Sequence, residues 1–234
     1  MNIIFYSHST FSLKIDNLYL LFDPFITKNP NILKYKKKYI LNHLFSLNLK
    51  FILISHAHYD HVCDVELIAK KMNSIIISNY EITNFYSKKG LKTIPINYGS
   101  FLKIDCFKIK YVWACHSSTF EDGSSGGNPG GFLIKKNKKI IYFSGDTSLN
   151  LEMKLIPFLV KNPINLAIFP LGGVFTMDFK DAIIASDYVK CNKILGVHYN
   201  TFPSISIDNH LVKKNFKKNK KKLILLDTFE KINI

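Results

Sequence analysis

The chain has 234 residues, 47% of them hydrophobic, which is enough for one domain with a sizeable core. No run of 18 uncharged apolar residues occurs, and the N-terminus lacks a basic leader with a cleavage site, so we expect neither a membrane span nor a signal peptide. The formal net charge is +15, but arginine, the residue that binds phosphate bidentately, is absent, so we expect no nucleic-acid partner.

The lysine and cysteine contents give little information about which function the protein has. All 32 basic residues are lysine, and the chain is also rich in asparagine, isoleucine, phenylalanine and tyrosine, as proteins of A/T-rich genomes are. We therefore interpret the lysine excess as mutational drift, with attraction of anionic substrates as a side effect. The four cysteines show no paired spacing, which indicates reduced thiols in a cytoplasmic protein.

The chain opens with three apolar stretches between residues 3 and 22, which predict a hairpin-rich half-sheet. His8 follows the first stretch and is either a substrate contact in a cleft or an ordinary turn histidine. Asp23 follows the third, where it either hydrogen-bonds a neighbouring loop or belongs to a turn before proline. Residues 28–50 are rich in lysine and predict irregular structure, with His43 at the surface.

The most informative stretch is His56-Ala57-His58-Tyr59-Asp60-His61, between an apolar run and an amphipathic helical pattern. In an extended chain, residues two apart point the same way, so His56 and His58 can bind one ion together. Asp60 and His61 follow the turn into the helix and can bind a second ion. Imidazole and carboxylate are ligands that suit Zn, Mn or Fe.

A short strand is predicted at residues 75–78, and Asn79 follows it. Asn79 either lines a cleft or belongs to a plain turn. A helix is predicted over 80–89, with Gly90 ending it.

Residues 101–113 alternate as one long strand that leads into His116. The glycine-rich segment 121–131 then forms either a substrate-facing lid or a long hairpin connection. We take Asn128, within it, as a candidate substrate contact.

The second half of the chain repeats the pattern of polar residues at strand ends. Residues 132–143 predict a hairpin whose second strand leads to Asp146, which is either a site residue or a helix N-cap. His198 follows the predicted strand 193–197 in the same way. The remaining predicted elements are a buried strand at 166–170, helices at 178–190 and 207–221, and a last strand at 223–226.

The H-x-H-x-D-H string at residues 56–61 resembles the metal motif of the metallo-β-lactamase superfamily. The resemblance implies an α/β (α+β) fold, a four-layer αββα sandwich, as a single domain over residues 1–234 that repeats a β-rich unit twice. The implied ligands of the first metal are His56, His58 and His116, and those of the second are Asp60, His61 and His198, with Asp146 bridging the two.

Two further strings resemble a branch of metal-dependent hydrolases similar to L-ascorbate-6-phosphate lactonase. These are Ser7-His8-Ser9-Thr10-Phe11 and the H-Y-x-T-F-P string that begins at His198. Gly173 and Val174 stand where that branch has an acid and an amide, so the substrate contacts there differ.

The residues and the resemblance together predict a hydrolase with a binuclear metal centre, most simply of zinc, with manganese or iron as the other options. A metal-bound hydroxide would cleave a small anionic ester, lactone or phosphate-bearing substrate, with Asp60 accepting a proton. Candidate substrate contacts are His8, Asn79 and Asn128. The alternatives are a phosphodiesterase or RNA-processing nuclease of the same fold and a lysine-rich nucleic-acid-binding protein with a vestigial metal site. Assembly into a homo-oligomer is compatible with the sequence.

Overall fold

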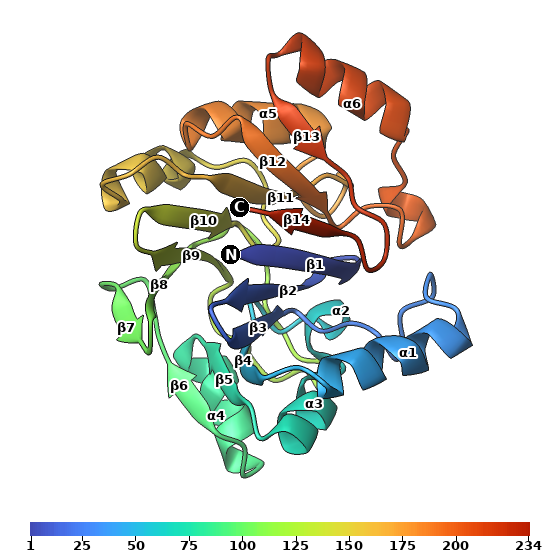
Figure 1. The fold of residues 1–234 in the computed structure, drawn as a ribbon, viewed down its shortest axis with the longest axis vertical. Coiled ribbons are helices and arrows are strands. Elements are labelled where there is room, and N and C mark those ends of the chain that lie inside the picture. The colour runs from blue at the N-terminus through green and yellow to red at the C-terminus, as the bar shows by residue number, and fades with distance from the viewer. The chain divides into compact units, whose positions relative to one another are not determined.

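The computed structural model describes residues 1–234, and the chain divides into two compact units. Unit 1 comprises residues 1–97, 117–129 and 227–234, and unit 2 comprises residues 98–116 and 130–226. Each unit contains one seven-stranded sheet, its own helices and its own hydrophobic core (Figure 1). The predicted mixed α/β class is therefore confirmed.

The sheet of unit 1 has the strand order β14-β1-β2-β3-β4-β5-β6. Strands β1 to β3 pair antiparallel and β3 to β6 pair parallel, with helices in the parallel connections. Helix α3 packs on β4, α4 packs on β5 and β6, and α1 contacts α3. The bounds are β1 Asn2–Ser7, β2 Thr10–Ile15, β3 Leu18–Phe22, α1 Lys34–Phe45, β4 Leu49–Leu53, α2 Tyr59–Val62, α3 Val65–Met72, β5 Ile75–Ser78, α4 Tyr80–Lys88, β6 Thr93–Pro95 and β14 Lys231–Asn233.

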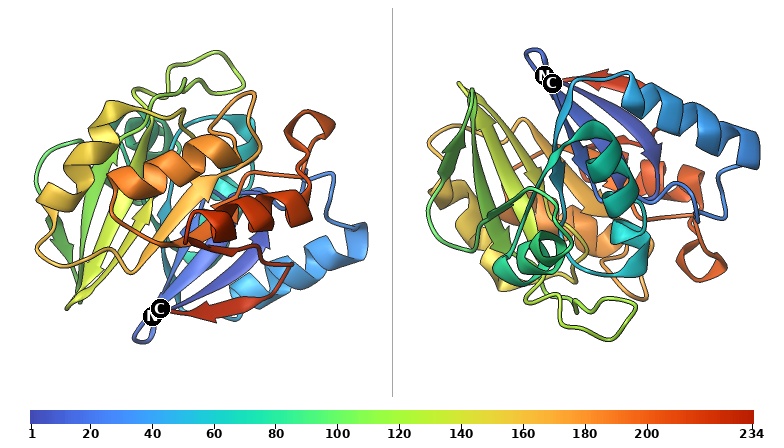
Figure 2. Two further views of the ribbon diagram at one scale, coloured as in Figure 1. Left: turned by 90° about the horizontal axis from the view of Figure 1, so that it is seen from above. Right: turned by 90° about the horizontal axis from the view of Figure 1, so that it is seen from below.

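The two chain ends lie side by side in unit 1 (Figure 2). Strand β14 pairs antiparallel with β1, and the backbone N–H of Ile234 donates to the carbonyl of Met1 at 3.0 Å. The C-terminal segment thus completes the edge of the sheet that begins with the N-terminus.

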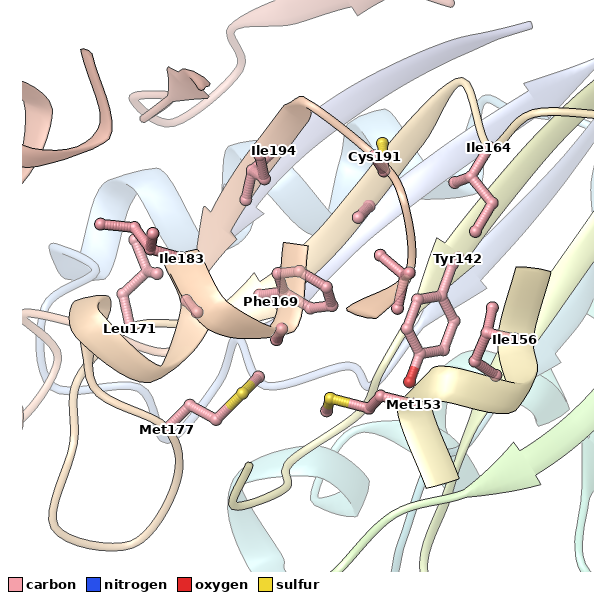
Figure 3. Close-up of a cluster of buried hydrophobic side chains, with 14 of the residues drawn as sticks. Tyr142, Met153, Ile156, Ile164, Phe169, Leu171, Met177, Ile183, Cys191 and Ile194 are labelled. Atoms are coloured by element: carbon pink, nitrogen blue, oxygen red, sulfur yellow. The ribbon is translucent and has the colours of Figure 1, made fainter. Parts of the chain in front are cut away.

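The sheet of unit 2 has the order β13-β12-β11-β10-β9-β8-β7. Strands β7 to β10 pair antiparallel and β10 to β13 pair parallel. Tyr142 and Phe169 pack edge to face in its core beside Met153 and Met177 (Figure 3). The bounds are β7 Leu102–Ile104, β8 Phe107–Trp113, β9 Gly130–Lys136, β10 Lys139–Phe143, the 3₁₀ segment η1 Leu151–Leu159, β11 Leu166–Pro170, α5 Phe179–Tyr188, β12 Lys193–Val197, η2 Pro203–Ile205, α6 Asn209–Lys218 and β13 Lys222–Ile224.

The two units share one strand plan. The run β1 to β6 and the run β8 to β13 have the same order and the same sequence of antiparallel and parallel pairings, and each carries one extra antiparallel edge strand. The predicted repetition of a β-rich unit is confirmed at the level of topology.

Three local predictions are wrong, two of them about the segment 28–50. Residues 34–45 form helix α1, because Ile40 and Leu44 lie on one helical face and are buried, a pattern that the intervening lysines conceal. His43 on this helix is half-buried, not a surface residue, and its ring packs against Tyr6 and Phe229.

The predicted long strand at 101–113 is also wrong, because it is a hairpin of β7 and β8. Asp105 turns the chain there with φ of 45°, a conformation that Asp tolerates. No helix of the chain is long and apolar enough to span a bilayer.

Candidate metal centre

The strand directions of unit 1 bring several predicted site residues to one edge of its sheet. Strands β1, β3, β4 and β5 run in the same sense, so their carboxyl ends meet at that edge. His8 follows β1, Asp23 follows β3, and the segment 54–61 follows β4. In open α/β sheets this is the edge at which ligands bind.

His56 and His58 lie side by side, as their two-residue spacing predicts. The Nε2 of His56 is 2.9 Å from the Nδ1 of His58, so the two ring nitrogens point to one place. The Nδ1 of His56 meets the Oγ of Ser55 at 2.9 Å, and the Nε2 of His58 is 3.2 Å from the Oγ of Ser117. Ser55 therefore fixes the His56 ring with its Nε2 presented as a ligand atom.

Asp23 anchors this loop, which is one of the two alternatives that the sequence left open. Its carboxylate accepts the backbone N–H of Ser55 at 2.8 Å and the Ser55 hydroxyl at 2.6 Å, and lies 2.9 Å from the Nδ1 of His61. Asp23 and His61 are both fully buried. Burial raises the pKa of the Asp23 carboxyl above its ordinary value, although His61 and Ser55 act in the opposite direction. Because Asp23 engages Nδ1, the Nε2 of His61 is the ring nitrogen that could serve as a ligand atom.

His8 lies against the second pair of the motif. Its Nε2 is 3.1 Å from Asp60 Oδ2, which in turn is 3.7 Å from the Nε2 of His61. One ligand atom from each of these three side chains falls within a 4.8 Å cluster. The prediction left open whether His8 is a site residue or a turn histidine, and the contact with Asp60 favours the site.

Unit 2 contains a smaller group at the matching sheet edge. Asp146 follows β10, His198 follows β12, and the Asp146 Oδ2 is 2.9 Å from the Nε2 of His198. The two side chains are almost fully buried. No helix begins at Asp146, because the next helical segment starts at Leu151, so the N-cap interpretation is wrong.

His116 follows β8 at the same edge of unit 2, because β8 runs in the sense of β10 and β12. Thr147, which follows β10, connects the segment after β8 to the segment after β11 through hydrogen bonds. Its hydroxyl accepts the backbone N–H of Cys115 at 2.9 Å, and its carbonyl accepts the backbone N–H of Met177 at 2.8 Å. Cys115 is exposed.

The side-chain amide of Asn79 makes structural hydrogen bonds to the protein backbone. Its Oδ1 accepts the backbone N–H of Ile82 at 2.9 Å and caps α4. Its Nδ2 donates to the carbonyls of Gly126 at 2.7 Å and Asn128 at 3.0 Å. Asn79 thus holds the glycine-rich loop, which is the connection between β8 and β9, whereas Asn128 is exposed. The predicted substrate contacts of both asparagines remain predictions.

Sequence reasoning missed the hydroxyl residues that support the histidines. These are Ser55 beside His56, Ser117 beside His58, and Ser118, whose Oγ accepts the backbone N–H of Ala57 at 3.2 Å. The available signal was their position, since each stands one or two positions from a predicted ligand in the sequence.

The donor set of unit 1 fits a divalent metal ion. Imidazole nitrogens and a carboxylate oxygen are borderline ligands of the kind that zinc and its neighbours prefer. The Nδ1 of His56 hydrogen-bonds to the Ser55 hydroxyl oxygen and the Nδ1 of His61 to the Asp23 carboxylate, which orients both rings in an arrangement typical of metal-ligating histidines.

Residues 19–199 match the family described as beta-lactamase superfamily domain. The chain is 47% identical to the UPF0173 metal-dependent hydrolase of Flavobacterium johnsoniae over 234 residues, all of both chains. It is 46% identical to the metal-dependent hydrolase of Christiangramia forsetii over the same full lengths.

Solved structures also resemble the chain in fold. Igni18, a metallo hydrolase from the archaeon Ignicoccus hospitalis, has a TM-score of 0.86 at 29% identity, covering 99% of this chain and 97% of its own. The metallo-beta-lactamase fold protein YhfI from Bacillus subtilis has a TM-score of 0.75 at 14% identity, covering 99% and 98%. The predicted metallo-β-lactamase fold is thereby confirmed.

Proposed function

Because the chain belongs to the beta-lactamase superfamily and is a metal-dependent hydrolase, we propose that its histidine and aspartate residues form a binuclear centre that cleaves small anionic substrates. The observation that carries this proposal is the hydrogen-bonded network of unit 1, in which Ser55 and Asp23 present His56 and His61 as ligands. The hydrogen bonds of this network compensate the burial of its polar groups and hold both rings in fixed orientations, as a metal site requires.

We assign the ligands from both units. One ion would be held by His56, His58 and His116, and the other by Asp60, His61 and His198, with Asp146 bridging them. Zinc is the metal that these ligands suit best, and manganese or iron would be accommodated by the same donors. Since the ligands come from both units, residues 1–234 would act as one hydrolase domain.

The ions, when bound, supply Lewis acidity that lowers the pKa of water to about 7. The protein side chains would hold the reacting groups in position and accept the proton of the attacking water. Asp60 is the proposed proton acceptor, because its Oδ2 lies 3.1 Å from His8, a hydrogen bond that holds this oxygen in place. His8 would thereby position the acceptor and line the substrate side of the centre.

The proposed substrate is a small ester, lactone or phosphate-bearing compound. A net charge of +15 favours the approach of anions over neutral substrates. The four cysteines form no disulfide, which fits a reducing cytoplasmic setting for this chemistry.

The test compares His58→Ala with His210→Ala, an exposed histidine of α6 outside the ligand set. We expect His58→Ala to lose bound metal and to reduce turnover of a lactone and ester panel to background, because one of the histidine ligands of an ion is gone. His210→Ala should keep both. Elemental analysis and the activity panel, extended to phosphodiesters, give the two readouts.

Full activity of the metal-free protein would refute the proposed function. Turnover of phosphodiesters with none of lactones would replace the small-ester assignment by the phosphodiesterase alternative, with the metal centre unchanged.

A further inference from the structure

A concave site of unit 1 lies on α1 and shares no lining residue with the proposed metal centre. It is a cavity of about 440 Å³ lined by Tyr35, Lys36, Tyr39, Thr228 and Phe229. We call it the α1 slot. Its walls come from α1 and from the turn that precedes β14.

The walls of the α1 slot are aromatic and open to solvent. The side chains of Tyr35 and Tyr39 are 68% and 64% exposed, so their rings are accessible to a ligand. They stand four residues apart on α1, so they lie one above the other on the same helical face. Phe229 meets Tyr39 edge to face, with ring centroids 5.0 Å apart. Three rings therefore border a space into which a further flat ring can pack.

Phe229 is held in place by an unusual backbone. Its φ is 72°, in the left-handed region that a bulky side chain rarely adopts. The turn is fixed by hydrogen bonds: the N–H of Phe229 donates to the Phe5 carbonyl at 2.8 Å, and the Thr228 hydroxyl donates to the Tyr6 carbonyl at 3.0 Å. Strain of this kind persists where the surrounding structure enforces it, and it clusters at functional positions.

The charge around the α1 slot is positive. Between Asp23 and Asp60 the chain has six lysines and no acidic residue. The first turn of α1 contains no acid, and no side chain caps it. Lys37 donates to the Thr27 carbonyl at 2.9 Å, whereas Lys36 at the slot makes no ion pair or hydrogen bond. Asp227 and Glu230 place two negative charges beside the turn, and the Glu230 carboxylate is directed toward the Asp227 backbone N–H, from which it accepts at 2.8 Å.

We propose that the α1 slot binds a small planar aromatic anion, with its ring against Tyr35, Tyr39 and Phe229 and its phosphate or carboxylate on Lys36. Aromatic walls recognise the face of a ring, and an uncompensated lysine recognises the negative charge. A mononucleotide combines both features. The site does not use the metal ligands, so it would bind its ligand with or without metal in the proposed hydrolase centre.

The probe is adenosine 5′-monophosphate, measured by isothermal titration on the full chain with and without chelator. Adenosine lacks the charge and ribose 5-phosphate lacks the ring. We expect each of these to bind at least about fivefold more weakly, since stacking and charge each contribute. Affinity should be the same with chelator present.

Two pairs of variants separate the slot from general surface effects. Tyr39→Leu should weaken binding roughly tenfold, whereas Tyr80→Leu, on an equally exposed tyrosine of α4, should leave it unchanged. Lys36→Ala should weaken binding about threefold, whereas Lys214→Ala on the lysine-rich α6 should not. Thermal unfolding of each variant confirms that the fold is intact.

The proposal is overturned if Tyr39→Leu and Tyr80→Leu bind the nucleotide equally well. It is also overturned if a long oligoadenylate binds more than tenfold tighter than the mononucleotide, which would make α1 a nucleic-acid surface. A concentration-dependent dimer that Tyr39→Leu abolishes would instead show that this face packs against a second copy.

Discussion

The two units have the same strand plan but present their polar residues in different ways. After its first strand, unit 1 has His8 and unit 2 has His116; after the third strand, they have Asp23 and Asp146. The fourth strand ends in the 54–61 loop in unit 1 and in the loop 171–177 in unit 2. One topology therefore places site residues at matching strand ends, while the chemistry at those ends has diverged.

The difference lies in how each group is held. In unit 1, side-chain hydrogen bonds connect Asp23, Ser55, His56 and His61 into one buried network. Left-handed backbone occurs at His8 and Asp23 in unit 1 as well as at His198 in unit 2, so the feature particular to unit 2 is the close packing of Gly172 against the His198 carbonyl. We infer that the site residues are held in place mainly by side-chain hydrogen bonds in unit 1 and mainly by close backbone packing in unit 2.

The largest expected effect comes from Asp23→Ala, which removes the centre of the unit 1 network. The Ser55 N–H, the Ser55 hydroxyl and His61 would each lose a buried partner, so the free energy of unfolding should fall by about 3 kcal/mol. Metal content should fall as well, because His56 and His61 lose their orientation. Urea unfolding and elemental analysis measure the two effects.

Asp64→Ala is the matched control, since Asp64 is also a buried carboxylate of unit 1. It accepts the backbone N–H groups of Ile26 at 2.6 Å and Thr27 at 2.9 Å and has no bond to a histidine. It should lower stability while folded protein keeps its metal. Equal metal loss in both variants would show that stability, rather than ligand orientation, controls metal content.

The next largest effect tests the backbone packing of unit 2. A methyl group at Gly172 would lie 2.5 Å from the His198 carbonyl oxygen and 2.6 Å from the Ile205 Cβ. Gly172→Ala should therefore destabilise the protein by about 2 kcal/mol and displace His198, with loss of part of the bound metal. Gly99→Ala, where a methyl group meets nothing within 4 Å, should change neither property. Full metal content in Gly172→Ala would show that His198 does not depend on this contact.

The sequence was sufficient to predict the strand ends at which polar residues gather. Buried apolar runs locate β4, β10 and β12, and parallel pairing then dictates that their carboxyl ends share an edge within each sheet. The helix end at Gly90 was also predictable, and Gly90 has the expected left-handed φ of 77°. These features depend on local composition and short periodicities.

The remaining features depend on tertiary context. Left-handed backbone at His8, Asp23 and His198 has no local sequence signal, because each is imposed by the strands around it. The sequence offered a hydrogen bond from Asp23 to a neighbouring loop as one alternative, but it could not identify Ser55, 32 positions away, as the partner. Edge strand β14 is three residues long and gains its structure only by pairing with β1.

A smaller, stabilising effect is expected in unit 2 at Val174. This residue has φ of 59°, a conformation that a β-branched side chain adopts only under strain, and its side chain is 78% exposed. Val174→Gly should therefore raise the free energy of unfolding by about 1 kcal/mol, because little packing is lost and the strain is relieved. Chemical denaturation measures the gain. Val112→Gly, at a buried β8 position, should lose stability instead. A loss of stability in Val174→Gly would mean that the exposed side chain contributes more than its backbone costs.

The smallest effect compares one thiol from each unit. Cys63 follows the unit 1 ligands, where burial and then the neighbouring Asp64 raise its pKa to about 12, whereas Cys115 in unit 2 is exposed. At about pH 8 only roughly one in ten thousand Cys63 thiols would be ionised, so iodoacetamide should modify Cys115 first. Raising the pH should bring Cys63 into reaction only above about pH 11, and mass spectrometry of peptides distinguishes the two sites. Equal rates at about pH 8 would require α2 to open transiently, which would contradict the rigid side-chain network inferred for unit 1.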